Sequence, residues 1–146
     1  MKKIILIGGI GCGKTTLCQR INGLDIEYKK TQALEAVNLT IDTPGEYLEN
    51  RLYNRALVVT STEADMVVFV QDAAADRFMF SPSQASSYYP KEVIGVVSKT
   101  DAASEKQIEQ AKELLYLAGA NPVFCLSAFD GSGVDAFIDY ITYYIT

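Results

Sequence analysis

The most informative absence in this chain of 146 residues is histidine, which does not occur at all. Mechanisms that need an imidazole base or an imidazole metal ligand are therefore excluded, among them those of the Ser-His-Asp and Cys-His hydrolases. An excess of cationic residues is also missing, because 13 Lys and Arg stand against 18 Asp and Glu and leave a net charge of −5. Binding to a phosphate backbone needs a basic face, so we expect no nucleic-acid partner.

Long apolar runs and paired cysteines are absent as well. No stretch approaches the roughly 20 apolar residues of a membrane helix, and the first apolar run, residues 4–7, is too short for a signal peptide. The three cysteines are an odd number without metal-binding spacing, which favours a reducing compartment. We therefore expect a cytoplasmic protein without a membrane span.

What is present is an alternation of strand and helix patterns that is typical of an α/β domain. Continuous apolar runs predict buried strands, and apolar residues at helical spacing predict helices that cover them. Repeated β-α-β units then build a mostly parallel sheet with helices on both faces. Strands are expected at 4–7, 37–41, 66–70, 93–97 and 122–126, and helices at 14–22, 51–63, 134–145 and between Ser104, as part of a capping box, and Gly119.

The strongest motif is a glycine-rich turn between the first strand and the first helix. Residues 8–15 read GGIGCGKT and fit G-x-x-x-x-G-K-[ST] in the context that this phosphate-binding motif requires. Backbone amides and the helix N-terminus would surround the phosphates, with Lys14 at the β- and γ-phosphates and the Thr15 hydroxyl on Mg²⁺. The predicted phosphate-binding residues are Gly8, Gly11, Cys12, Gly13, Lys14, Thr15 and Thr16.

A second polar element, DTPGE at 42–46, follows the strand expected at 37–41. Ligands of open α/β sheets bind outside the carboxyl ends of the strands, so Asp42 would face the phosphates and hold Mg²⁺ directly or through water. The Gly45 amide would approach the γ-phosphate. Alone, this pattern describes an ordinary turn, but together with the phosphate loop it predicts a site for a nucleoside triphosphate with Mg²⁺.

Two more polar elements, SKTD at 98–101 and Ser127-Ala128, also follow expected strands. With all four elements in this order, the chain resembles the small-GTPase-like P-loop proteins and, more narrowly, the EutP/PduV family of ethanolamine and propanediol utilisation. The shared features are IGGIGCGKTT at the start, KTQA at 30–33, DTPGEY at 42–47 and the strand end VIGVVSKTD. The resemblance covers nearly the whole chain and implies a single three-layer P-loop NTPase domain, residues 1–146, of minimal size.

The resemblance also implies a base pocket made of Lys99, Asp101, Ser127 and Ala128. Asp101 matches the family position whose carboxylate accepts hydrogen bonds from guanine N1 and its exocyclic amine, donors that adenine does not offer. The Lys99 stem would lie along the base, and the Ala128 amide would donate to the guanine oxygen. In the alternative interpretation there is no base site, Asp101 caps the following helix and Lys99 is solvated.

Three positions bear on how the site would work. Ser98 stands where GTPases usually carry Asn, so base selectivity is expected to be relaxed and ATP is kept as an alternative ligand. Glu46 stands where many GTPases place a water-orienting Gln, and a carboxylate near the γ-phosphate predicts slow turnover, with Glu46 and Lys14 as the catalytic candidates. Thr31 is either a second hydroxyl ligand of Mg²⁺ or a loop threonine.

We therefore predict a Mg²⁺-dependent nucleoside-triphosphate-binding protein that hydrolyses GTP slowly. The resemblance links it to ethanolamine or propanediol utilisation and to a protein partner in a bacterial microcompartment. The first alternative is an acetate kinase, which would need an acceptor pocket with a cation from Arg51, Arg55 or Arg77. The second is a nucleotide-gated binding module for microcompartment components, with Phe78-Met79-Phe80 either an exposed partner patch or folded over the sheet.

Overall fold

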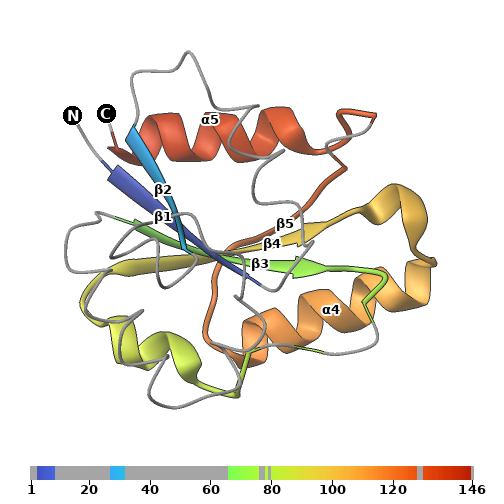
Figure 1. Ribbon diagram of the computed structural model, residues 1–146, viewed down its shortest axis with the longest axis horizontal. Coiled ribbons are helices and arrows are strands. Elements are labelled where there is room, and N and C mark those ends of the chain that lie inside the picture. Colours follow the sequence, from blue (N-terminus) through green and yellow to red (C-terminus); the bar gives the residue numbers. More distant parts are fainter. Residues whose placement is uncertain are drawn as a thin grey trace.

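The computed structural model (Figure 1) describes residues 3–8, 27–31, 66–75, 78, 80–127 and 130–145. The strand expected at 37–41 and the helices expected at 14–22 and 51–63 lie outside these residues. The other four strands and two helices are found within a few residues of where the sequence predicts them. The elements are β1 (Lys3–Gly8), β2 (Glu27–Thr31), β3 (Met66–Asp72), β4 (Glu92–Ser98), β5 (Val123–Cys125), α4 (Glu105–Leu117), α5 (Val134–Ile145) and two 3-10 helices, η1 (Gln84–Tyr88) and η2 (Thr100–Ala102).

The five strands form one sheet in the order β2-β1-β3-β4-β5, and every neighbouring pair is parallel. All carboxyl ends therefore lie at one edge of the sheet, and in Figure 1 the arrows of β3 and β4 point to the right, toward this edge. Helix α4 covers one face and α5 the other (Figure 1). The expected α/β class, with a parallel sheet between helices, is confirmed.

Strand β2 is the one described strand that the sequence patterns do not predict. Its residues, EYKKT, carry three charges and lack the apolar run of β1. Among the described strands β2 ends the sheet order. Thr31 is the last residue of β2 and pairs with Ile7 of β1, so it belongs to a strand and the interpretation as a loop threonine is wrong.

The central strands are buried on both faces, which explains their continuous apolar runs. Successive side chains alternate between two separate clusters, so that Ile5 and Phe69 pack on the α4 side while Leu6 and Val68 pack on the α5 side. These four side chains are all 0% exposed. Burial of this kind stabilises a domain by about 25 cal/mol per Å² of apolar surface, and it fixes the strands whose ends carry the polar elements.

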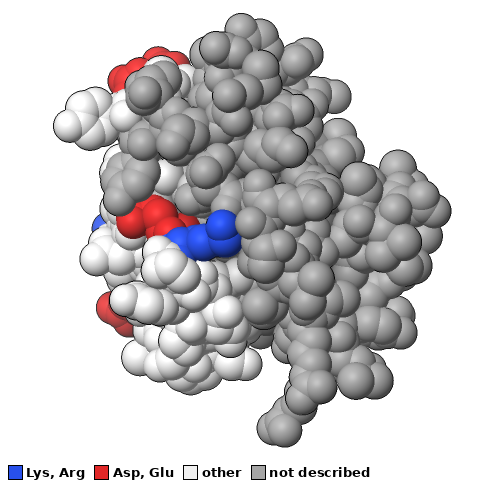
Figure 2. Space-filling model, turned by 90° about the vertical axis from the view of Figure 1, so that its left-hand side faces the viewer, with Lys and Arg blue, Asp and Glu red and all other residues white. Residues whose placement is uncertain are grey.

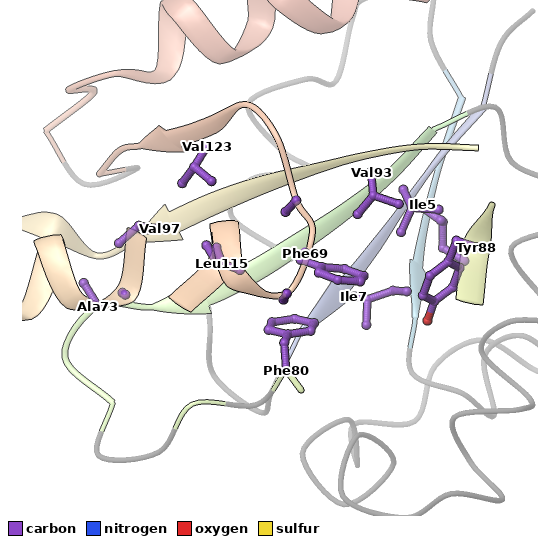
Figure 3. Packing of buried hydrophobic residues seen from close by; sticks show 14 residues of the cluster. Ile5, Ile7, Phe69, Ala73, Phe80, Tyr88, Val93, Val97, Leu115 and Val123 are labelled. Carbon is purple, nitrogen blue, oxygen red and sulfur yellow. The ribbon is translucent and has the colours of Figure 1, made fainter. Parts of the chain in front are cut away.

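The segment between β3 and β4 folds down over the sheet beside α4. The Phe80 ring stacks on that of Phe69, with centroids 4.4 Å apart, and Tyr88 of η1 meets Phe69 edge-on at 5.7 Å (Figure 3). Phe78 is half-buried against the same cluster. For Phe78 and Phe80 the interpretation as an exposed partner patch is therefore wrong, while Met79 lies outside the described residues. Burial raises the pKa of the Tyr88 phenol, which stays neutral here.

Helix α4 begins and ends as the sequence predicts. The Ser104 hydroxyl accepts from the Gln107 amide at 3.1 Å, and the Gln107 side chain accepts from the Ser104 amide at 2.8 Å, which completes the capping box. Gly119, at φ +98°, follows the last turn. Because Ser104 caps α4, the side chains of the preceding turn are left for other contacts.

Candidate functional site

The carboxyl edge of the sheet brings together two of the predicted base-pocket residues, Asp101 and Ser127. The Ser127 hydroxyl donates a hydrogen bond of 2.6 Å to Oδ1 of Asp101, although the two residues are 26 positions apart. The amide of Thr100 reaches the carbonyl of Leu126 at 3.4 Å, so the backbone that follows β4 is tied to the backbone that follows β5. The interpretation of Asp101 as a helix cap is wrong, since Ser104 fills that role.

Ser127 is fully buried and Asp101 is exposed, so the hydrogen bond between them runs from the interior of the protein to its surface. The buried hydroxyl donates to one carboxylate oxygen, and an ionised carboxylate has about four lone-pair sites for donors. Hydrogen bonds to a charged acceptor are stronger than bonds between neutral groups. The exposed carboxylate is therefore oriented by the protein and can accept further donors from a ligand.

A compact turn holds Ser127 in place. The amide of Gly131 donates to the Ser127 carbonyl at 2.9 Å, and the amide of Asp130 donates to the Ser127 hydroxyl at 3.3 Å. The Ser132 hydroxyl and amide both donate to Oδ1 of Asp130, at 2.6 and 2.8 Å. These bonds, the hydroxyl's first, lower the pKa of the Asp130 carboxyl, so it stays ionised. Asp130 is not predicted from the sequence, although the string DGS has the composition of a turn.

Lys99 lies directly after β4 in a left-handed conformation, at φ 58° and ψ 39°. Its ammonium nitrogen is 3.5 Å from Oδ2 of Asp72, the last residue of β3. Its side chain is 44% exposed, so Lys99 is partly solvated as well as close to Asp72, and the interpretation of Lys99 as a solvated lysine stays open. Asp72 is absent from the predicted site, although it ends β3 two residues after the buried apolar run 66–70.

Ser98, which stands where GTPases usually carry Asn, is the last residue of β4 and is 4% exposed. Its hydroxyl donates to the carbonyl of Gln71 in β3 at 3.3 Å. Its own carbonyl accepts from the amide of Ala73 at 2.9 Å. Ser98 therefore helps to join the carboxyl ends of β3 and β4, the strands that lead to Asp72 and Lys99.

The predicted phosphate side of the site is described only at its start. Gly8 ends β1 and pairs with Val70, and Thr31 ends the neighbouring strand at the same edge. The remaining predicted site residues lie outside the described residues: Gly11, Cys12, Gly13, Lys14, Thr15, Thr16, Asp42, Gly45, Glu46 and Ala128. In the described part of the chain no three acidic, cysteine or histidine residues cluster as metal ligands. None of the helices described there is long and apolar enough to cross a membrane.

Two hollows of similar size lie at opposite edges of the sheet. The one beside Asp72 measures ≈ 410 Å³, and Gln107 and Gln110 of α4 contribute to its lining. The other measures ≈ 380 Å³ and is lined by residues such as Tyr89 and Asn121, which precede β4 and β5. Figure 2 looks at the side from which the strands begin, where the described surface is mostly uncharged. The connected polar contacts of the candidate site are at the carboxyl edge.

Residues 1–143 match the family model described as ethanolamine utilisation - propanediol utilisation, PduV-EutP. The chain belongs to this family. It is 45% identical over 135 residues to the propanediol utilization protein PduV of Citrobacter freundii, an alignment that covers 92% of this chain and 89% of the relative. It is 33% identical over 142 residues to the probable acetate kinase EutP of Escherichia coli K12, with coverage of 97% and 89%.

Solved structures with similar folds are P-loop GTPase domains. Elongation factor SelB from Methanococcus maripaludis, solved in complex with the GTP analogue GppNHp, matches with a TM-score of 0.64 at 21% identity, and the match covers 99% of this chain and 33% of SelB. A mutant NFeoB from S. thermophilus bound to GDP also matches with a TM-score of 0.64, at 20% identity, and covers 95% of this chain and 61% of that one. The family member described here therefore has the fold of the small GTPases.

Proposed function

We propose that this chain binds a purine nucleoside triphosphate, GTP in preference to ATP, at the carboxyl edge of its sheet. The observation that carries the proposal is the 2.6 Å hydrogen bond from the buried Ser127 hydroxyl to the exposed Asp101 carboxylate. It orients an acceptor toward solvent at the edge where ligands of parallel α/β sheets bind. Guanine offers two donors to such a carboxylate, and adenine offers none at the equivalent positions.

The phosphates belong, in this proposal, to the loop that begins at Gly8. Amides up to Thr16 and the Lys14 ammonium bind the phosphate oxygens, and the oxygens of Thr15 and Asp42 hold Mg²⁺, with Thr31 as a further hydroxyl at the same edge. Hydroxyl and carboxylate oxygens are the ligands that Mg²⁺ prefers. Mg²⁺ held by these residues would neutralise charge on the phosphates. That SelB and NFeoB carry a GTP analogue and GDP supports the choice of guanine.

Hydrolysis is proposed to be slow. Catalysis of phosphoryl transfer rests on positioning and electrostatics, and Glu46 brings a negative charge to the position where many GTPases orient water with a neutral Gln. A partner that supplies a cation would relieve this repulsion. Membership of the family supports a role in ethanolamine or propanediol utilisation, with a microcompartment protein as the proposed partner.

Phosphoryl transfer to acetate is the second candidate, because relatives at 32–33% identity are named probable acetate kinases. A carboxylate acceptor needs a neutralising cation in its pocket. The hollow beside Asp72 is lined by the Asp72 carboxylate and by three glutamines, Gln71, Gln107 and Gln110, with neither lysine nor arginine among its described lining residues. Arg51, Arg55 and Arg77, the candidates for this cation, lie outside the described residues. Transfer to acetate therefore stays the second candidate, and a nucleotide-gated binding module stays the third.

One labelling experiment separates the three candidates. The purified protein is incubated with γ-labelled GTP or ATP and Mg²⁺, with and without acetate, and the label is followed. Release of inorganic phosphate, faster with GTP, is the expected result. Formation of acetyl phosphate would replace the proposal by the kinase, and tight binding without turnover would replace it by the module. Lys14→Ala is the control for the site, since normal triphosphate binding by that variant would contradict the whole proposal.

A further inference from the structure

Asp72 lies beside the proposed base pocket and is anchored by its own turn. The amide of Ala74 donates to Oδ1 at 2.8 Å, which fixes the carboxylate relative to β3. The other oxygen, Oδ2, is the one that lies 3.5 Å from the ammonium of Lys99. The carboxylate side chain is only 21% exposed. A carboxylate that is fixed by its own turn and largely buried therefore faces the Lys99 ammonium.

The backbones that carry the two residues are joined to each other. Asp72 pairs with Ser98 in the β3–β4 ladder, and the amide of Ala73 continues the ladder to the Ser98 carbonyl at 2.9 Å. Lys99 follows in its left-handed turn, so its Cα is placed by the sheet. The backbone does not determine the conformation of the Lys99 side chain, because its four-carbon stem has many rotamers when the ammonium is not held.

If the Lys99 stem is restricted before a ligand binds, we expect a larger effect on ligand affinity than on the stability of the fold. An ion pair of which one side chain is 44% exposed contributes little to stability, because water and salt screen it. A lysine stem that must lie along a purine base, in contrast, loses rotamer freedom on binding unless it is already held. We propose that Asp72 is a positioning residue of the nucleotide site, which holds the Lys99 stem in place for the base. This inference rests on the proposed nucleotide site and extends it to a residue of β3.

The substitution Asp72→Asn tests the role of the charge. The variant keeps the shape of the side chain and an oxygen that accepts from Ala74, but it loses the attraction to Lys99. If Asp72 positions Lys99, GDP and GTP affinities fall about three- to tenfold, measured by calorimetry. Simple electrostatics predicts the opposite sign, because removal of an anion near a polyphosphate tightens binding. Unchanged or tighter nucleotide binding would therefore overturn the inference.

Two further measurements show where the effect arises. Inorganic tripolyphosphate has no base, so Asp72→Asn should not weaken its binding, and an equal loss for tripolyphosphate and GTP would also overturn the inference. In a Lys99→Met background, Asp72→Asn should have no further weakening effect, because the ammonium is gone. Glu113→Gln on exposed α4 is the matched control: it removes the same charge and should leave all affinities unchanged.

The outcome also separates this inference from the proposed function. If the wild-type protein binds neither GTP nor ATP, the nucleotide site itself is wrong and the role of Asp72 falls with it. If the wild type binds GTP and Asp72→Asn binds it equally well, the proposed function stands and only the positioning role is lost.

Discussion

The middle of the sheet is apolar and buried, whereas its carboxyl edge is polar and partly exposed. In the middle, β1, β3 and β4 are apolar and enclosed on both faces, and side chains such as Leu6 and Phe69 have no exposed surface. At the edge, strands of the same sheet lead into serine, lysine and aspartate, which contact each other from different strands. The middle supplies most of the free energy of folding, and the edge supplies oriented polar groups.

The comparison shows that the buried middle of the sheet holds the residues of the carboxyl edge in place, whereas contacts at the edge contribute little to the stability of the fold. Partly exposed polar contacts contribute on the order of 1 kcal/mol each, whereas one fully buried aromatic side chain contributes several times as much. Substitutions in the middle should therefore lower the stability of the fold, and substitutions at the edge should lower the affinity for ligand. Three predictions test this division, from the largest effect to the smallest.

Phe69→Ala should have the largest effect on stability. Phe69 is 0% exposed and contacts both Phe80 and Tyr88, so truncation removes buried surface and leaves a cavity under the segment that follows β3. We expect the free energy of unfolding to fall by about 3–5 kcal/mol, measured by urea denaturation. Tyr143→Ala, at an aromatic that is 84% exposed, is the control and should change it by less than about 0.5 kcal/mol. Equal losses at the two positions would contradict the division.

Gly133→Ala should have an intermediate effect, because Gly133 lies where the edge and the core meet. Its φ is +74°, and an added Cβ would collide with the Cys125 carbonyl and lie 3.2 Å from the Leu126 Cα. We expect a loss of more than about 2 kcal/mol, which combines the cost of a left-handed alanine with the collision. Gly131→Ala is the matched control, since its φ is +82° but its Cβ would meet nothing within 4 Å. If Gly131→Ala lowered the free energy of unfolding as much as Gly133→Ala, the close contact of residue 133 with the Cys125 and Leu126 backbone would be unimportant.

Most of the described fold follows from local patterns in the sequence. The apolar runs of β1, β3 and β4 predict burial on both faces of the sheet. Ser104 and Gly119 predict where α4 begins and ends. Strand β2 could not be predicted in this way, because its charged sequence lacks an apolar run and the strand is held by pairing with β1. The packing of Phe80 on Phe69 is equally non-local, so the course of the segment between β3 and β4 could not be read from its residues.

The candidate site was predictable in its location and less so in its contacts. Asp101 and Ser127 each follow a strand that the sequence predicts, and parallel strands end at one edge, so their proximity could be expected. The direct hydrogen bond between them depends on how the two following turns meet, which no spacing determines. Asp72 was missed because a single aspartate after a strand is also the composition of an ordinary turn.

Ser127→Ala should have the smallest effect on stability and a clear effect on binding. The lost hydroxyl donates to Asp101 and accepts from the Asp130 amide, but Asp101 is exposed and water can take over its bond, so we expect about 1 kcal/mol or less. Without the hydroxyl the carboxylate is no longer oriented, and GTP affinity should fall about tenfold, which corresponds to roughly 1.4 kcal/mol. Ser132→Ala in the same turn, which removes the hydroxyl bond to Asp130 and leaves the Ser127–Asp101 bond intact, should keep GTP affinity within about twofold. A loss of affinity at Ser132 that matched the loss at Ser127 would mean that the whole turn, and not the oriented carboxylate, supports the ligand.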